Sequence, residues 1–419
     1  MTEKVYRRCC GMDVHKDTVV VCVLPPLGEQ GEIRRKRFRT FTADLNQMRG
    51  WLKRLKVTEI AMESTGVYWR CVWNVLEEHG FRLVLVNPAQ VKALQGRKSD
   101  PRDAKRIAEF LEDERLDPSV VPTCEFRELR TLLRNRVHLL EERNQVFNQI
   151  RDLFESANLK FSSVASNLLG VSGRRILEAI LAGQESPEML SWKLKGHLRK
   201  KEKEAKLALR GEFSDFLRLM LRLTYQRYEF LSQQVAALEA EVARRMEPYA
   251  LQVQTLSTIP GVDRILAWQL IAELGVDMSV FPDADHAASW AGLSPGTCES
   301  AGKQLSGRTK KGNKYLRRGL TQAAWAASRC KQGYLRSFFY RVKGRRGWGK
   351  AIVAVAHKIL ITAYMILKTG QPYRELGGDY FDKLHPERTA KRLIERLERL
   401  GLEVRVVNRE PVDSVDNHG

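Results

Sequence analysis

The chain has 419 residues, and 43% of them are hydrophobic, which is enough for buried cores and excludes a disordered basic tail. Its 71 Lys and Arg residues outnumber 50 Asp and Glu residues, and the resulting net charge of +21 predicts a polyanionic partner, with nucleic acid first. A membrane partner is not expected, because charged residues interrupt every apolar run before it reaches about 18 residues.

The cysteines and the first ten residues indicate in which cellular compartment the protein is expected. Seven cysteines are scattered without a Cys-x-x-Cys pair, which is typical of reduced thiols and disfavours a zinc site. Residues 1–10 contain charges and no apolar signal core, so export is not expected. We therefore predict a cytoplasmic protein.

Strand-like and helix-like segments alternate through residues 1–118, which predicts an α/β domain. The predicted elements are a two-stranded hairpin at Cys9–Leu24, a strand at Arg34–Thr42, a helix at Leu45–Leu55, a strand at Glu59–Met62, a helix at Val67–Glu78, a strand at Arg82–Val86 and a helix at Arg102–Leu116. Three successive strands followed by alternating helices and strands indicate a mixed sheet covered by helices.

Residues 119–250 are typical of a helical linker region. Helical character runs from Glu125 to Ala157, and Lys193–Arg210 carries eight basic and two acidic residues, as an exposed or phosphate-binding helix would. Apolar and aromatic positions then recur at alternating steps of four and three, at Leu217, Leu221, Thr224, Tyr228, Leu231, Val235, Leu238 and Val242. This seam predicts a coiled coil or, equally, one helix of an ordinary bundle.

Residues 251–375 predict a compact, mainly α-helical domain, and residues 376–419 a charged tail with one amphipathic helix. From Lys303 to Lys350 the sequence has 15 Lys or Arg residues and no acid, and Ser300 lies at the edge of this stretch. A hydroxyl nucleophile that acts on a phosphate backbone needs such a setting. The alternative is a solvated basic face beside an incidental serine.

Four acids form a second group of candidate functional residues. Asp13 lies in the first predicted strand and Glu63 at the end of the fourth, while Asp100 and Asp103 lie at the start of the predicted helix Arg102–Leu116. Carboxylates gathered at one sheet edge can bind one or two magnesium ions. Each acid also has a structural explanation, since Asp100 before Pro101 is a favourable helix N-cap and Asp103 suits the helix dipole.

Several motifs in a fixed order resemble one protein family across roughly residues 7–375. They are Gly11-Met-Asp-Val-His-Lys16, Glu63-Ser-Thr-Gly-Val-Tyr-Trp69, Asn87-Pro88, Lys98-Ser-Asp-Pro-Arg-Asp-Ala104, Ile259-Pro-Gly-Val262, Glu273-Leu-Gly275, Trp290-Ala-Gly-Leu-Ser-Pro295, Glu299-Ser-Ala-Gly-Lys303 and Gly307-Arg-Thr-Lys-Lys-Gly-Asn313. The sequence is similar to transposases of the insertion-sequence family numbered one hundred and ten, the bridge-RNA-guided DEDD recombinases.

The resemblance implies a ribonuclease-H-like, resolvase-like N-terminal domain, then the helical and coiled-coil region, then a serine transposase domain with a segment like a helix-hairpin-helix. It implies that Asp13, Glu63, Asp100 and Asp103 bind Mg²⁺ and that Ser300 forms a covalent phosphoserine link to DNA, with Ser306 as second choice. The phosphate-binding candidates are Lys303, Arg308, Lys310, Lys311, Lys314, Arg317 and Arg318.

The resemblance also implies partners. These are donor and target DNA, an element-encoded guide (bridge) RNA that supplies sequence specificity, and further copies of the chain in a dimer or tetramer, within the bacterial nucleoid. One hypothesis is that the carboxylates and the Ser300 loop act as one composite site, in one subunit or across two. The alternatives are a metal-dependent junction nuclease in which Ser300 is structural, and a non-catalytic nucleic-acid-binding relative.

Overall fold

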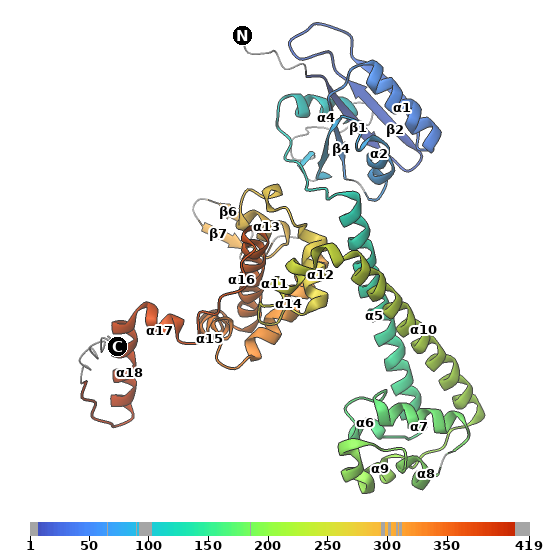
Figure 1. The fold of residues 1–419 in the computed structure, drawn as a ribbon, viewed down its shortest axis with the longest axis vertical. Coiled ribbons are helices and arrows are strands. Elements are labelled where there is room, and N and C mark those ends of the chain that lie inside the picture. The colour runs from blue at the N-terminus through green and yellow to red at the C-terminus, as the bar shows by residue number, and fades with distance from the viewer. Residues whose placement is uncertain are drawn as a thin grey trace, which may run out of the picture. The chain divides into compact units, whose positions relative to one another are not determined.

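The computed structural model describes residues 7–64, 66–88, 90–91, 103–184, 186–294, 298–300, 303–306, 309 and 312–406. They divide into two compact units, Met1–Thr123 and Cys124–Gly419. Figure 1 shows the elements of each unit, which we describe in turn.

A five-stranded mixed sheet forms the centre of the N-terminal unit. Its strands are β1 (Cys9–Val14), β2 (Thr18–Val23), β3 (Arg34–Arg39), β4 (Glu59–Glu63) and β5 (Arg82–Val86). They lie in the order β3-β2-β1-β4-β5, with β1, β2 and β3 antiparallel and β1, β4 and β5 parallel. The predicted mixed sheet is confirmed, including the hairpin that joins β1 to β2.

Helices cover both faces of this sheet. Helices α1 (Thr42–Arg54) and α2 (Trp69–Leu76) pack on one face against side chains such as Met12 and Ile60. Helix α4 (Asp103–Glu112) packs on the other face. The predicted extension of α4 to Leu116 is wrong, because Glu114 takes a left-handed conformation with φ of 55° and ends the helical path.

The C-terminal unit begins with a long antiparallel helix pair, α5 (Cys124–Ser156) and α10 (Asp215–Arg245) (Figure 1). Arg136 on α5 pairs with Glu239 on α10 at 2.6 Å, and Arg245 pairs with Glu128, as opposite chain directions require. All eight predicted seam positions of α10 are buried or half-buried in this single chain. The seam is therefore a packing face within the chain.

A small helical cap joins the far ends of α5 and α10. Its elements are α6 (Phe161–Val164), α7 (Val171–Leu181), α8 (Pro187–Ser191), the 3-10 helix η2 (Gly196–Lys201) and α9 (Glu202–Ala208). Their apolar side chains share one core with the ends of α5 and α10. The predicted basic helix at Lys193–Arg210 is split into η2 and α9, since Gly196 at φ of 58° starts a separate turn.

A helical bundle follows α10. It contains η3 (Glu247–Tyr249), α11 (Ala250–Leu256), α12 (Arg264–Leu274), η4 (Met278–Val280), α13 (Ala284–Trp290), α14 (Lys314–Arg329), α15 (Tyr334–Arg346) and α16 (Trp348–Thr369). Within the described residues, α16 is the one helix apolar and long enough to span a bilayer, but half of its apolar stretch is buried. It packs against α11, α13, α14 and α15, as a core helix does.

Two short strands interrupt the predicted all-helical segment. They are β6 (Cys298–Ser300) and β7 (Lys303–Ser306), which pair antiparallel. Sequence analysis missed them because three or four residues are too few for strand periodicity to show. The tail holds α17 (Tyr380–Leu384) and the predicted amphipathic helix α18 (Pro386–Arg399), neither of which buries a side chain.

Candidate active site

Two predicted acids lie side by side at one edge of the sheet. Strands β1 and β4 are parallel neighbours, and Met12 stands opposite Met62 in their register. Asp13 and Glu63 are the next residues on each strand, so their side chains leave the same face of the sheet. Both side chains are half-buried. The expectation that these strand-end carboxylates meet is supported by this register.

Gly11 explains how a third acid reaches this edge. A Cβ atom on Gly11 would lie 2.1 Å from the carbonyl oxygen of Ala104 and 2.5 Å from the amide nitrogen of Ala108. The backbone of α4 therefore rests directly on β1, on the face that Gly11 and Asp13 share. Asp103 precedes Ala104 as the first residue of α4. The close approach holds Asp103 beside the strand-end acids.

The charges of both other acids act on Asp13. Burial raises the pKa of Asp13 above its ordinary value, a hydrogen-bonded His15 opposes that rise, and the negative charges of Asp103 and Glu63 add to it. His15 places Nε2 3.0 Å from Oδ2 of Asp13. Sequence analysis placed His15 in a motif without giving it a role. The three acids and His15 make an electrostatically coupled group.

Asp103 has the feature that a cation would satisfy. Its Oδ1 atom is buried and accepts no hydrogen bond from any described residue. Within the described ranges no group of three or more His, Cys, Asp and Glu side chains is placed so that it could hold a metal ion, and Asp100 lies outside those ranges. An orphaned carboxylate oxygen beside two further carboxylates fits a hard divalent cation. The type of donor therefore suits the predicted metal, but the described residues alone do not form its site.

The predicted nucleophile lies on the β6–β7 hairpin. Ser300 is the last residue of β6 and stands opposite Lys303, the first residue of β7. Ser306, the second choice, stands at the far end of the hairpin opposite Cys298. The backbone therefore pairs Ser300, and not Ser306, with a basic residue. Arg308, Lys310 and Lys311 lie outside the described residues.

The other basic candidates lie on the first turns of α14. Lys314 and Arg318 are exposed, and Arg317 is half-buried. Arg318 already forms an ion pair with Glu141 on α5, and Lys314 places its Nζ 5.0 Å from the ring centroid of Tyr315. Lys314 is thus the most accessible of these three cations to a phosphate.

A buried ionic cluster that sequence analysis did not foresee fixes the start of α14. Glu273 of α12 is 2% exposed and accepts hydrogen bonds from Arg134 on α5, at 2.8 and 2.9 Å. It also accepts one from Asn313, at 2.6 Å, and pairs with Arg130 at 3.3 Å. Asn313 in turn caps α14 by accepting from the amides of Tyr315 and Leu316. Glu273 thereby positions the helix that carries Lys314.

Burial acts on one cation of this cluster, Arg130. It lowers the pKa of Arg130 to about 10, and the neighbouring Glu273 offsets part of that effect. The sequence signal was the motif Glu273-Leu-Gly275, but its arginine partners lie up to 143 residues away. No local pattern could have identified them.

The segment that resembles a helix-hairpin-helix, Ile259-Pro-Gly-Val262 with α12, has its turn and helix start occupied by contacts within the protein. Gly261 has φ of 88°, and a Cβ there would lie 2.3 Å from the carbonyl oxygen of Ala323, so the turn is packed against α14. Asp263 caps α12 and accepts from the amide of Leu266 at 2.8 Å. A carboxylate therefore occupies the helix start where a phosphate would bind.

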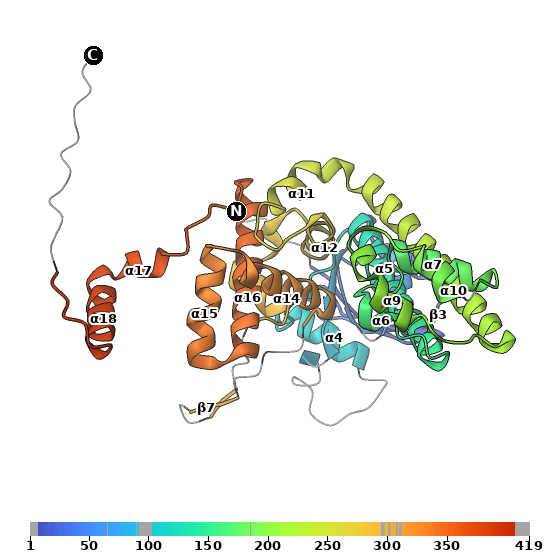
Figure 2. The same ribbon diagram turned by 90° about the horizontal axis from the view of Figure 1, so that it is seen from below.

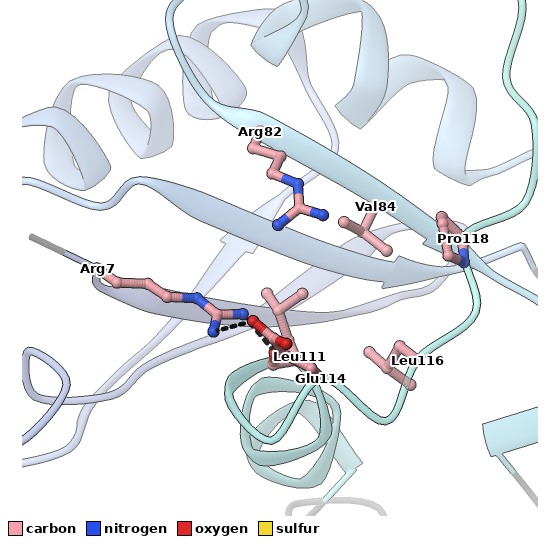
Figure 3. A pocket seen from close by; sticks show the side chains of 7 residues that line it. All are labelled: Arg7, Arg82, Val84, Leu111, Glu114, Leu116 and Pro118. Carbon is pink, nitrogen blue, oxygen red and sulfur yellow. Dashed lines mark hydrogen bonds and ion pairs between the residues drawn. The ribbon is translucent and has the colours of Figure 1, made fainter. Parts of the chain in front are cut away.

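A pocket of about 210 Å³ lies at the other end of the N-terminal sheet (Figure 3). Arg7 and Arg82, from the starts of β1 and β5, line it together with Glu114. Both arginines pair with Glu59, at 2.8 and 3.1 Å, and Arg7 also pairs with Glu114. These ion pairs stabilise the sheet edge opposite the acids, and we assign the pocket no catalytic role.

Comparisons with known proteins agree with this picture. A family model described as a transposase, of the DEDD type of IS110, matches residues 10–158, and one described as the transposase IS116/IS110/IS902 family matches residues 253–340. The chain belongs to the IS110 family of transposases. This transposase carries both parts of the family, and the first match includes every predicted carboxylate.

Relatives of the transposase come from several bacteria. A protein named probable family 20 transposase, from Pseudomonas aeruginosa, is 26% identical over 68% of this chain and 75% of its own length. The transposase for insertion sequence element IS1111A, from Coxiella burnetii, is 24% identical over 87% of this chain and 90% of its own length. The transposase for IS1328, from Yersinia enterocolitica, is 37% identical over 26% of this chain and 32% of its own length. The protein is thus an insertion-sequence transposase, an enzyme that acts on DNA.

Proposed function

We propose that this transposase cuts and exchanges DNA strands at specific sites through a covalent phosphoserine intermediate, with Ser300 as the nucleophile. The observation that carries the proposal is the convergence of Asp13, Glu63 and Asp103 at one sheet edge, with an orphaned oxygen on Asp103. The strand order β3-β2-β1-β4-β5, with acids at the ends of β1 and β4, supports a ribonuclease-H-like fold for this unit.

The carboxylates would hold a divalent cation, which we propose is Mg²⁺, with Asp100 as a further ligand. A bound Mg²⁺ supplies positive charge that lowers the pKa of a hydroxyl and stabilises phosphate oxygens in the transition state. The protein's own residues fix the acids in place, since α4 rests on β1 without room for a side chain at Gly11. His15, at 3.0 Å from Asp13, orients that carboxylate.

The chemistry of Ser300 accounts for strand exchange without an energy source. Its Oγ attacks a DNA phosphorus atom, an O–P bond forms to serine, and the bond to the leaving strand's oxygen breaks. The serine proton passes to a base, and a proton from that base or from water goes to the leaving oxygen, so that the leaving strand departs as a hydroxyl. In the reverse step a hydroxyl of the other strand attacks phosphoserine and releases Ser300. Lys303, which stands opposite Ser300, and Lys314 would bind phosphate groups near the reacting strand.

We propose that an element-encoded RNA selects the donor and target sites by base pairing. The net charge of +21 and the basic segment Lys193–Arg210 support a large phosphate-binding surface. Pairing would supply the sequence selectivity while the protein contacts the backbone and its shape. Protein with and without the flanking transcript should therefore differ in binding to the element's own ends.

We propose that the transposase works as a dimer or tetramer. The heptad seam of α10 is occupied by α5, so contact between copies requires another face. A second row on α10 is exposed, and contains Phe216, Leu219, Leu223 and Phe230 at 53–67% exposure. These residues share one helix face at steps of three, four and seven. Leu223→Asp should lower the mass measured by analytical ultracentrifugation, whereas Gln234→Asp on the same helix should not.

The deciding experiment looks for a covalent adduct. The protein, Mg²⁺, the transcript of the element's flank and end-labelled donor and target DNA are incubated together, and label on protein is read on a denaturing gel. We expect label that disappears in Ser300→Ala and in Asp13→Asn but remains in Asp17→Asn, since Asp17 is exposed outside the sheet. Cleaved DNA without labelled protein would favour a hydrolytic junction nuclease. Label that survives in Ser300→Ala and is lost in Ser306→Ala would assign the nucleophile to Ser306 instead.

A further inference from the structure

Three exposed aromatic side chains gather where α14, α15 and α16 meet. Trp325 on α14 is 37% exposed, Tyr340 on α15 is 50% exposed, and Trp348 at the start of α16 is 48% exposed. Other rings on these helices are buried or half-buried, such as Phe339 at 1%. Figure 2 shows the three helices side by side. Two neighbouring tryptophans left in water mark a binding surface.

The rings are arranged as a platform. Trp325 and Trp348 stack with centroids 4.9 Å apart and an angle of 29° between their planes. Phe339 contacts both Tyr340 and Trp348 edge-on, at 5.2 and 5.1 Å between centroids, and fixes the two rings from below. The surface formed by Trp325, Tyr340, Lys343 and Trp348, which we call the aromatic platform, is therefore held rigidly by the helices.

Cations lie on this platform. Lys343 places its Nζ 4.4 Å from the centroid of Trp348 and 5.5 Å from that of Tyr340. Arg329 lies 5.8 Å from Trp325, and Arg336 lies 5.5 Å from Tyr340. Cations held over rings can interact with a phosphate while the aromatic surface contacts a base.

The surroundings of the platform carry positive charge. Residues 344–350, which comprise the end of α15, Gly347 and the start of α16, are all exposed and include Arg345, Arg346 and Lys350. The sequence contains no acid from Lys303 to Arg374. An apolar protein surface would match the exposed rings but not the surrounding positive charge. A polyanion with flat apolar groups matches both the rings and the charge.

We propose that the aromatic platform binds unpaired nucleotides of a single-stranded nucleic acid. Bases stack on the exposed parts of Trp325, Trp348 and Tyr340. The cations Lys343, Arg345, Arg346 and Lys350 hold the adjoining phosphates. Paired bases in a duplex are already stacked on each other and do not present their faces, so the platform selects single strands. This inference rests on the proposed function only in taking nucleic acid as the partner.

The test measures binding of the full-length protein to three fluorescent probes, an oligo(dT) of about 20 nucleotides, an oligo(rU) of the same length and a duplex of matched length. Loss of a stacking ring should weaken single-strand binding about 5- to 100-fold in Trp348→Leu and Trp325→Leu. Trp348→Phe keeps a ring and should restore most of the affinity. Phe41→Leu, an exposed ring 66% exposed on the other unit, is the matched control.

Salt dependence tests the role of Lys343. Lys343→Gln removes one phosphate contact, so the slope of log affinity against log salt should fall by about 0.7, and Lys343→Arg should retain it. Photocrosslinking to an oligonucleotide that contains 5-iodouracil should label the peptides that hold Trp325, Tyr340 or Trp348. Thermal melting of each variant checks that its fold is intact.

The outcomes separate the possible ligands. Stronger binding of oligo(dT) would assign the platform to a displaced DNA strand, stronger binding of oligo(rU) to RNA, and equal binding to single strands of either kind. Equal affinity of the duplex, or unchanged binding in both leucine variants, would overturn the inference. The measurement is oligonucleotide binding and needs no cleavage, so a failure of the catalytic proposal leaves this result readable.

Discussion

Glu273 in the C-terminal unit and Asp13 in the N-terminal unit are both acids withdrawn from water, yet their surroundings are opposite. Glu273 is 2% exposed and bonded to Arg130, Arg134 and Asn313. Among the described residues Asp13 has a hydrogen bond with His15, and its pKa is raised by burial and, to a smaller extent, by the like charges of Asp103 and Glu63. A carboxylate that the fold fully compensates holds helices together, whereas one left among like charges is available to bind a cation.

The largest effect should follow from breaking the compensated cluster. Glu273→Ala leaves two buried or half-buried arginines and the Asn313 cap without their acceptor, which should cost about 3–5 kcal/mol of stability. Thermal unfolding with hydrogen exchange on peptides of α5 and α12 would measure it. Glu204→Ala, at an exposed position on α9, should change stability by no more than about 0.5 kcal/mol. Equal losses of stability in Glu273→Ala and Glu204→Ala would contradict the structural role of Glu273.

A smaller loss should come from separating α4 from β1. Gly11→Ala places a methyl group where the Ala104 oxygen and Ala108 nitrogen now lie, which should cost about 1–3 kcal/mol and displace Asp103. Strand cleavage should fall with it. Gly50→Ala in α1 meets nothing within 4 Å and should instead stabilise the protein, by up to about 1 kcal/mol. Opposite signs in urea unfolding would confirm that space, not glycine content, decides the outcome.

Removing the charge of Asp13 should separate activity from stability. Asp13→Asn relieves the repulsion from Asp103 and Glu63, so the metal-free variant should melt at a higher temperature than the parent protein. Removing a residue that only hydrogen-bonds a metal ligand typically lowers activity about 10- to 100-fold. Because Asp13 would itself be a ligand, the rate of cleavage should fall by more than this. A calorimetric scan and a cleavage assay on the same preparation test both statements. A lower melting temperature would show that the carboxylate is needed for folding.

The pH dependence should be the mildest effect. Because the pKa of Asp13 is raised in the folded state, its ionised form destabilises the metal-free fold, so stability should decline as pH rises from the unfolded pKa through the folded one. Mg²⁺ needs the ionised form, so its affinity should fall on acidification at a higher pH than for an ordinary aspartate. Titration calorimetry across pH, repeated with Asp13→Asn, should show that shift disappear.

The sequence predicted the N-terminal sheet well because its strands are short apolar runs separated by turns and helices. It predicted which acids stand at strand ends, and the register of β1 and β4 supports that placement. It could not show that Gly11 lets α4 touch the sheet, since that requires two segments far apart in sequence. The motif Glu273-Leu-Gly275 was visible in the sequence. A glutamate in a motif, however, can be either a structural member of a buried ion pair or a catalytic acid, and the residue type alone does not distinguish the two.

The same limit applied to the aromatic residues. Spacing along α14–α16 is helical for buried and exposed rings alike, so the sequence could not separate Phe339 from Trp348. Helix packing does so, because α16 buries one side of its length and leaves its first turn in water. The heptad seam was ambiguous in a similar way. The pattern predicts that one face of α10 is packed, but it does not identify α5 as the helix that packs against it.

The pairing of α5 with α10 also sets a length. The seam on α10 repeats every seven residues, and the cap core and the α11–α16 bundle are built from separate side chains at the two ends of this hairpin. Inserting or deleting seven residues in both helices would keep the seam in register and change the separation of its ends by about 10 Å. The hairpin is thus an adjustable spacer, which evolution or an engineer can lengthen in whole steps without redesigning either end.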